Sequence, residues 1–194
     1  MNSKRYPVIL DLETQYTFRD FEDHKNLKIS VAGIYDYKEA KLKSFFEDEL
    51  ASLFPILENA SIIIGFNIID FDLKVFSSYY PGDTRQFRTF DILEDIRRIL
   101  GRRISLNDLL KATLGKVKTG HGLDSINYYR QGQWEKLKQY CLDDVDLTRE
   151  IFEYGVEKKS IYYLNEKGKQ KVVVDWGKYL KVTGSSEITL TLPF

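Results

Sequence analysis

Short apolar runs divide the first half of the chain and predict β-strands. Val8–Leu12 and Ser61–Gly65 are aliphatic, and the second is apolar throughout, as is typical of a strand buried on both faces. Lys28–Tyr37 and Lys41–Phe46 are separated by three residues and predict a hairpin, with Gly33 as a possible bulge. Gln86–Phe90 is predicted to form a further short strand.

Apolar residues at helical spacing predict the helices between and after these strands. The predicted helices are Asp48–Asn59, Asp72–Tyr79, Ile92–Leu100, Ser105–Leu114 and about Trp134–Tyr154. Pro55 is expected to bend or break the first helix, Gly101 to end the third, and Ser105 with Asp108 to form a capping box. Strands followed by alternating helices and strands predict an α/β domain with a mixed sheet.

The last part of the chain has a different pattern. A glycine-containing loop is predicted at residues 116–122, and a second hairpin at about Ser160–Val174, which turns near residues 165–168. A length of 194 residues fits one domain with an appendage. We therefore expect one domain over residues 1–156, and a C-terminal hairpin extension and tail over residues 157–194.

Composition narrows the class of protein. The 29 basic and 29 acidic side chains give no net charge, so any contact with nucleic acid must be local. The single cysteine, Cys141, excludes a disulfide framework, and no Cys or His cluster predicts a zinc site. No leader pattern or run of 18 apolar residues is present, so we expect a cytoplasmic protein without a membrane segment.

Two acidic residues share one face of the first predicted strand. Side chains alternate along a strand, which places Asp11 and Glu13 with Ile9, opposite Leu10 and Leu12. Two carboxylates at the end of a core strand repel each other and lose hydration, which is typical of a functional site. Strands also often end in polar loops, so this pair alone does not decide between the two interpretations.

The long C-terminal helix carries an acid within its apolar stripe. The stripe contains Trp134, Leu137, Cys141, Val145, Thr148 and Phe152. Asp144 falls inside it, so its carboxyl must be protonated, paired or bound to a cation. Tyr140 lies one helical turn earlier, so its hydroxyl can reach the group that the Asp144 carboxyl contacts. A core tyrosine beside a buried ion pair explains the pattern equally well.

A third acidic segment joins a buried strand to a helix. Asp70 and Asp72 both lie near the predicted helix start, where either fits as a cap or first-turn acid, and periodicity does not choose between them. If these segments converge, their carboxylates suit Mg²⁺ or Mn²⁺. A shared two-ion site requires Asp144 to lie within about 10 Å of Asp11 and Glu13.

These segments together resemble the DEDD superfamily of 3′–5′ exonucleases, which have the ribonuclease H-like fold. Asp11–Thr14 is similar to the first motif of that superfamily. Gly65–Leu73 is similar to the second, especially as found in the proofreading domains of family-B DNA polymerases. Tyr140–Asp144 matches the Tyr-x-x-x-Asp form of the third, and Gln139 stands where the other subclass has histidine. The resemblance covers roughly residues 6–155 and selects the tyrosine subclass.

The resemblance implies a fold and a set of site residues. The fold is a mixed five-stranded sheet flanked by helices. Four carboxylates are implied to hold two divalent cations, Mg²⁺ or Mn²⁺: Asp11, Glu13, Asp72 and Asp144. Tyr140 is implied to orient the attacking water, and Thr14 and Asn67 to touch the terminal nucleotide. Phe66 or Phe71 stacks on the last base or belongs to the core.

A basic segment follows the predicted third helix. Residues 97–118 hold seven basic residues and one acid, a local excess of six, which indicates either a phosphate-binding surface or ordinary solvated helix faces. We expect Arg102, Arg103, Lys118 and His121 to contact substrate.

The expected substrate is the 3′ end of single-stranded DNA. An RNA-trimming enzyme with the same site, and a catalytically silent nucleic-acid-binding module, remain as alternatives. A replication or repair partner would act in trans, because the sequence has no polymerase or helicase segment.

Overall fold

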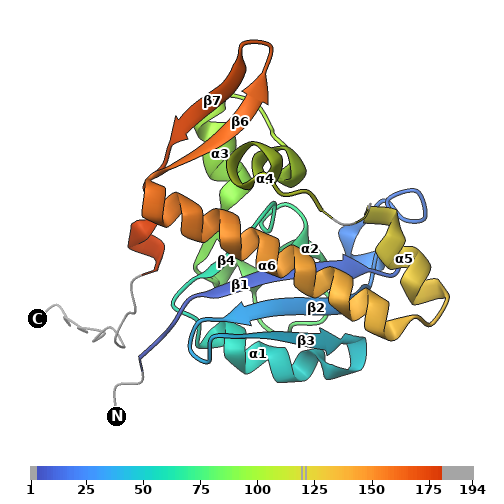
Figure 1. The fold of residues 1–194 in the computed structure, drawn as a ribbon. Coiled ribbons are helices and arrows are strands. Elements are labelled where there is room, and N and C mark those ends of the chain that lie inside the picture. The colour runs from blue at the N-terminus through green and yellow to red at the C-terminus, as the bar shows by residue number, and fades with distance from the viewer. Residues whose placement is uncertain (1–3, 119, 121, 181–194) are drawn as a thin grey trace, which may run out of the picture.

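The protein has a five-stranded mixed sheet at its centre. The computed structural model describes residues 4–118, 120 and 122–180 (Figure 1). The strands are β1 Val8–Thr14, β2 Ile29–Asp36, β3 Lys41–Phe46, β4 Ile63–Gly65 and β5 Thr89–Asp91. Their order is β3-β2-β1-β4-β5, with β1, β2 and β3 antiparallel and β1, β4 and β5 parallel. The predicted fold class is therefore confirmed.

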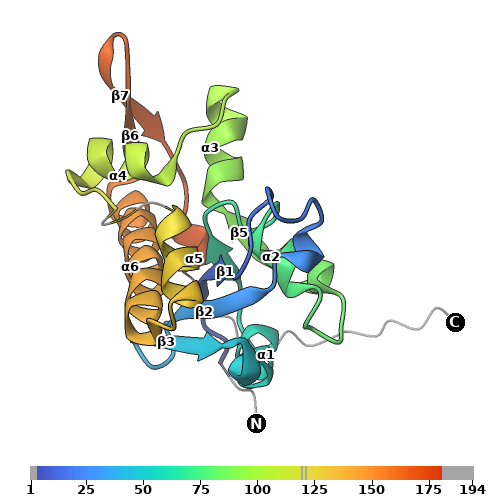
Figure 2. The same ribbon diagram turned by 90° about the vertical axis from the view of Figure 1, so that its right-hand side faces the viewer.

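Helices cover both faces of this sheet (Figures 1 and 2). They are α1 Leu50–Glu58, α2 Asp72–Phe76, α3 Ile92–Leu100, α4 Leu106–Leu114, α5 Gly122–Arg130 and α6 Trp134–Lys158. The core on one face contains apolar residues of α3, α4 and α6, and the core on the other contains those of α1 and α2. The sheet therefore separates two hydrophobic layers.

The alternation of β1 decides which side chains face α6. Ile9 belongs to the α6-side core, whereas Val8, Leu10 and Leu12 belong to the core beneath α1 and α2. Because the side-chain period of a strand is two, Asp11 must project on the same side as Ile9. The predicted assignment of faces along β1 is confirmed.

Gly33 permits the close approach of α6 to β2. A Cβ atom at Gly33 would lie 2.8 Å from Sγ of Cys141 and 2.9 Å from Cγ2 of Val145. The pairing of β1 with β2 is regular at Gly33, and its register shifts instead between Glu13 and Thr14. The predicted bulge at Gly33 is wrong, and the glycine is required by packing.

Two predictions about the helices are also wrong. The break predicted at Pro55 does not occur, because Pro55 lies on the exposed side of α1, where water can satisfy the carbonyl left without a donor, and the helix continues to Glu58. The bend predicted as the alternative stays a prediction. Trp134, placed in the apolar stripe of α6, is 47% exposed because it lies in the first turn of the helix. The predicted C-terminal end of α3 is confirmed, since Gly101 follows it with φ of +70°. The predicted N-terminal cap of α4 is also confirmed, since Ser105 Oγ accepts from the backbone N–H of Asp108.

The C-terminal hairpin forms as predicted, from β6 Ser160–Asn165 and β7 Gly168–Val173. It stands out beyond α4 at the top of Figure 1. Thr113 of α4 joins it to the domain, because its Oγ1 accepts from the backbone N–H of Tyr162 at 2.9 Å and donates to the Tyr162 carbonyl at 3.0 Å. The division of the chain after residue 156 stays a prediction.

Trp176 fixes the segment that follows the hairpin against α6. Its indole is stacked on Phe152 with ring centroids 6.0 Å apart, and Nε1 donates to Oδ2 of Asp95 at 2.8 Å. The side chain is only 1% exposed. The segment therefore contributes to the main core. No helix in the described part of the chain is both long and apolar enough to cross a membrane.

Gly155→Ala tests this packing. A Cβ atom at Gly155 would lie 2.2 Å from Cε3 of Trp176, so the indole must move. We expect a loss of about 2 kcal/mol in the free energy of unfolding, seen as a melting temperature lower by about 4–8 °C. Gly177→Ala is the control, since nothing lies within 4 Å of a Cβ atom there. Equal melting of the two variants would contradict the packing described.

Candidate active site

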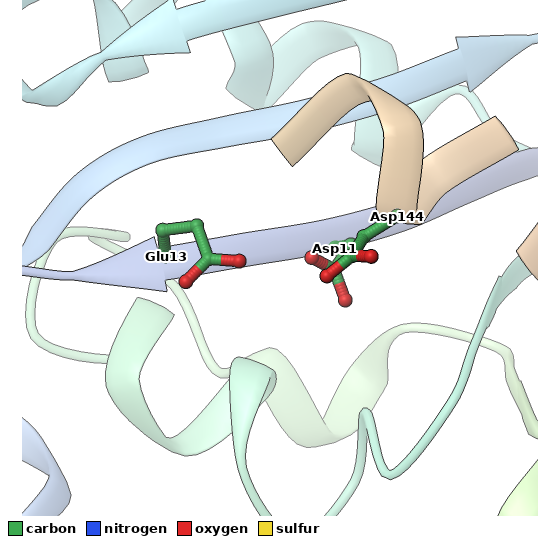
Figure 3. A group of neighbouring side chains, drawn as sticks. All are labelled: Asp11, Glu13 and Asp144. Atoms are coloured by element: carbon green, nitrogen blue, oxygen red, sulfur yellow. The ribbon is translucent and has the colours of Figure 1, made fainter. Parts of the chain in front are cut away.

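Three carboxylates converge where α6 crosses β1. Asp11 and Glu13 project from the α6-facing side of β1, and Asp144 projects from α6 toward them (Figure 3). One carboxylate oxygen from each residue can be chosen so that the three atoms lie within 4.8 Å of one another. This distance is well inside the limit of about 10 Å that a shared two-ion site requires.

A fourth carboxylate, Asp72, comes from the opposite layer. Strand β4 pairs with β1 only at Val8 and Ile9 and then turns away toward α2. The backbone N–H of Leu12 donates instead to Oδ1 of Asp72, at 3.1 Å. Asp72 is 3% exposed, whereas Asp70 lies on the surface in an ion pair with Lys74. The ambiguity between these two acids ends here: only Asp72 faces the cluster.

Asp91 supports the loop that leads to α2. Its carboxylate accepts from the backbone N–H groups of Asn67 and Ile69, both at 3.0 Å, and caps α3 through Glu94 N–H. Asn67 has φ of +66°, so the loop turns sharply at this point. Sequence analysis missed Asp91, and its only signal was its place before a helix, typical of a cap.

The four acids line one cavity of about 240 Å³. Several other residues with predicted site roles line the same cavity: Thr14, Phe66, Asn67, Phe71, Lys118 and Tyr140. Arg103 lies at its border and donates from Nη2 to Oδ1 of Asn67 at 2.6 Å. Arg102 lies outside the cavity lining, with its guanidinium over the ring of Tyr163. His121 lies outside the described residues.

Lys118 lies among the acids. Its Nζ is 2.6 Å from Oδ2 of Asp144, and its backbone N–H donates to Oδ1 of Asn107 at the start of α4. Burial acts to lower the pKa of Lys118, but the charges of Asp11 and Asp144 outweigh it, so that the pKa is raised. A protonated ammonium group therefore occupies part of the acidic cluster; the sequence allowed a buried ion pair at Asp144 but did not identify Lys118 as the partner.

Burial raises the pKa of all four acids, and repulsion by a neighbouring carboxylate adds to it: cluster members act on Asp11 and Glu13, Asp91 acts on Asp72, and Asp143 acts on Asp144. Burial is the largest cause in each case. The pKa of Asp11 is raised well above its ordinary value, with Asp72 and Asp144 adding to the effect of burial. The pKa of Glu13 is raised to about 8 despite a hydrogen bond with Ser125, and that of Asp72 to about 7. The metal-free cluster thus resists full ionisation.

Tyr140 presents a neutral hydroxyl beside the cluster. Burial, followed by the charges of Asp144 and Glu13, raises the pKa of Tyr140. The phenol therefore stays protonated at neutral pH and is able to donate a hydrogen bond. Gly120 lies against it, since a Cβ atom there would be 2.9 Å from Cε2 of Tyr140. Gly120 thus packs closely against the tyrosine ring.

Helix α5 supplies a contact that sequence analysis missed. Ser125 is completely buried and forms the hydrogen bond with Glu13. The helix was not predicted because its apolar residues extend over too short a stretch to show a helical period. The first of them, Leu123, is exposed. The remaining signals were weak: Asp124 in the first turn and Arg130 in the last, as the helix dipole favours.

The donor set fits hard divalent cations. It consists of carboxylate oxygens that line one cavity, from the half-buried Asp11 and Glu13 and the buried Asp72 and Asp144, and such oxygens are the ligands that Mg²⁺ and Mn²⁺ prefer. The raised pKa values show that added positive charge would stabilise the cluster, and the Lys118 ammonium already supplies some. Asp11, Glu13 and Asp144 would hold such ions, with Asp72 on the other side of the cavity.

The predicted basic surface is smaller than the sequence indicated. Four of the seven basic residues in 97–118 form ion pairs: Arg97 with Glu94, Arg98 with Asp95, Lys116 with Glu150 and Lys118 with Asp144. The excess of six positive charges counted in residues 97–118 overstates the basic surface. Glu94 and Asp95 lie just before this segment and neutralise Arg97 and Arg98. Within the described residues, Arg102, Arg103 and Lys111 have no carboxylate partner at ion-pair distance.

The fold and the cavity define a class of protein, an α/β domain with a carboxylate site suited to metal-assisted chemistry. The model of the RNase H superfamily matches residues 8–156, and the chain belongs to this superfamily. No curated protein matches the chain. Membership supports a nuclease-type function, and the acidic cluster is compatible with the divalent metals that such nucleases use.

A solved structure is similar in fold. It is the family B DNA polymerase from the hyperthermophilic archaeon Pyrobaculum calidifontis, with a TM-score of 0.58 and 14% identity. The similarity covers 78% of this chain but 24% of the polymerase, so the chain spans about a quarter of its length. Together with the family match, it confirms the resemblance inferred from the motifs and is consistent with a DEDD-type exonuclease.

The raised pKa values predict how the metal-free protein responds to pH. In the unfolded chain Glu13 ionises near its ordinary 4.5, but in the folded protein near 8, so the folded state holds more protons between these values. The free energy of unfolding should therefore fall as pH rises from about 5 to 8. Melting curves in EDTA across this range test the prediction, and a melting temperature that rises toward pH 8 would contradict it.

Asp11→Asn should relieve part of this repulsion. We expect the variant in EDTA at pH 8 to be more stable than the unaltered protein by roughly 1–2 kcal/mol, as happens when a strained active site loses a charge. Asp175→Asn is the control, because it also removes one carboxylate charge but its exposed side chain lies outside the cluster and pairs with Lys178. A variant less stable than this control would show that repulsion at Asp11 is unimportant.

Proposed function

We propose that this protein is a metal-dependent 3′–5′ exonuclease of the DEDD tyrosine subclass. Its substrate is the 3′ end of single-stranded DNA, and it hydrolyses phosphodiester bonds with two divalent cations. The observation that carries the proposal is the convergence of Asp11, Glu13 and Asp144. One carboxylate oxygen of each lies within 4.8 Å of one oxygen of each of the others. Asp72 and Tyr140 line the same cavity, so the constellation implied by the motifs lies in one place.

Each acid has a role in this proposal. Asp11, Glu13, Asp72 and Asp144 would hold the cations, which when bound would supply a Lewis acid for the phosphate and a lower pKa for the attacking water. The protein contributes the position of these groups and no covalent step. Tyr140 donates its hydroxyl proton to orient the water, and its raised pKa keeps that proton in place.

The residues beside the acids would bind the terminal nucleotide. Asn67 and Thr14 line the cavity next to the carboxylates and are placed to contact the sugar and phosphate. Phe71 is half-buried and has an edge-to-face contact with Phe18, so part of its ring is fixed by packing. Lys118 would leave Asp144 when cations bind and would then pair with the substrate phosphate.

The proposal is tested by digesting a 5′-labelled DNA strand with Mg²⁺ or Mn²⁺ and with EDTA. We expect a ladder of products shortened from the 3′ end, and no cleavage in EDTA. Asp144→Asn should lower the rate by roughly a thousandfold or more while the protein remains folded. Asp143→Asn is the control, since its side chain bonds to Gln139 and not to the cluster.

The same assay separates the proposal from its rivals. Labelled RNA digested in parallel reveals an exoribonuclease if it is cut faster than DNA. Cleavage of a circular single strand would reveal an endonuclease. If purified protein cuts no strand with either metal, or Asp144→Asn cuts at the normal rate, the proposal is wrong.

Tyr140→Phe should have a milder effect. Loss of the hydroxyl removes a hydrogen bond to the attacking water but no metal ligand, so we expect kcat to fall by about ten- to a hundredfold. The affinity for Mn²⁺, measured by calorimetry, should not change. An equal loss of Mn²⁺ affinity and activity would show that Tyr140 shapes the metal site instead.

A further inference from the structure

We infer that the β6–β7 hairpin is a second nucleic-acid contact surface, which binds the phosphate backbone away from the reacting end. This inference rests on the proposed nucleic-acid substrate and assigns a function to a segment beyond the matched residues 8–156. The surface consists of Tyr162, Lys169 and Lys171 on the hairpin, with Arg102 and Arg103 between it and the cavity.

The hairpin is basic in a protein that has no net charge. Residues 160–173, which form the hairpin, contain three lysines and one glutamate, a net charge of +2. In the described structure Lys158 pairs with Glu157, whereas Lys167, Lys169 and Lys171 have no carboxylate partner at ion-pair distance. Unpaired basic groups on a protruding element attract polyanions, since they are not neutralised by the protein itself.

One face of the hairpin is anchored and the other is open. Ile161 and Val172 are paired across the strands and are buried in the main core. Tyr162 and Lys171 are paired on the opposite face, where Lys169 Nζ lies 4.5 Å from the Tyr162 ring centroid. An aromatic ring flanked by lysines suits a nucleic-acid strand, because bases stack on the ring while ammonium groups contact phosphates.

Contacts join the cavity to the anchored face of the hairpin, since residues alternate along β6 and Tyr163 lies on the same face as Ile161, opposite Tyr162. Arg103 donates to Asn67, which lines the cavity, and the adjacent Arg102 guanidinium carbon lies 5.2 Å from the ring centroid of Tyr163 on β6. A second connection runs through α4, whose Thr113 bonds to the backbone of Tyr162. Figure 2 shows the hairpin standing above α4, beside α3. A strand that leaves the cavity past Asn67 would therefore meet Arg103 and Arg102 at the anchored face, and would reach the open face around the edge of the two-stranded hairpin.

The test compares Lys169→Ala/Lys171→Ala with Lys38→Ala/Lys41→Ala. The control pair is exposed in and beside the turn between β2 and β3, away from the hairpin in Figure 1, and removes the same charge. Binding of fluorescent single-stranded DNA is measured by anisotropy in EDTA, so that no strand is cut. Strands of about 6 and about 20 nucleotides are used, since only the longer one should extend from the cavity to the hairpin.

The expected result is a loss that depends on strand length. The hairpin variant should bind the longer strand about five- to tenfold more weakly, and the slope of log affinity against log salt should fall by about 1.4, which is two phosphate contacts. The shorter strand and the control variant should show no such change. If the hairpin variant keeps the length dependence and salt slope of the unaltered protein, or if the control loses as much, the inference is wrong.

Failure of the inference and failure of the proposed nuclease can be distinguished. Binding is measured without metal and requires no cleavage, so a catalytically silent protein would still show the hairpin contribution. Conversely, Mg²⁺-dependent cleavage with an unchanged length dependence would retain the nuclease and exclude the hairpin surface.

Discussion

The repulsion among buried carboxylates is the constraint on which the site depends. Asp11, Glu13 and Asp144 each place one carboxylate oxygen within 4.8 Å of the others, in surroundings that raise the pKa of each side chain. Such an arrangement costs stability in the absence of a cation and is retained in proteins chiefly where it has a function. Lys118, whose ammonium contacts Asp144, offsets part of this cost.

The rest of the fold holds these groups together against their repulsion. Gly33 lets α6 approach β2 closely, so that Asp144 reaches the face of β1 from which Asp11 projects. The early divergence of β4 from β1 leaves the Leu12 N–H for Asp72, and Asp91 holds the loop between them. Trp176 stacks on Phe152 and so packs against the C-terminal part of α6. Packing distributed over two cores therefore stabilises a locally unfavourable site.

Local patterns predicted the elements that carry the site, but not the contacts between them. The period of β1 placed Asp11 and Glu13 on one face, and the stripe of α6 singled out Asp144, because both depend only on backbone geometry. Asp70 and Asp72 could not be separated in this way, since their difference arises from the Leu12 N–H sixty residues away. Ser125, Asp91 and the Lys118 ion pair depend on contacts between distant segments, as does the role of Gly33.

The central claim is that distant acids form a cation site, and a crystal structure with Mn²⁺ tests it most directly through anomalous scattering. The account predicts anomalous peaks between Asp11, Glu13 and Asp144, with Lys118 Nζ displaced from its present position 2.6 Å from Asp144. Crystals in millimolar Mn²⁺ with no peak in this cavity, and with Lys118 still bound to Asp144, would contradict it.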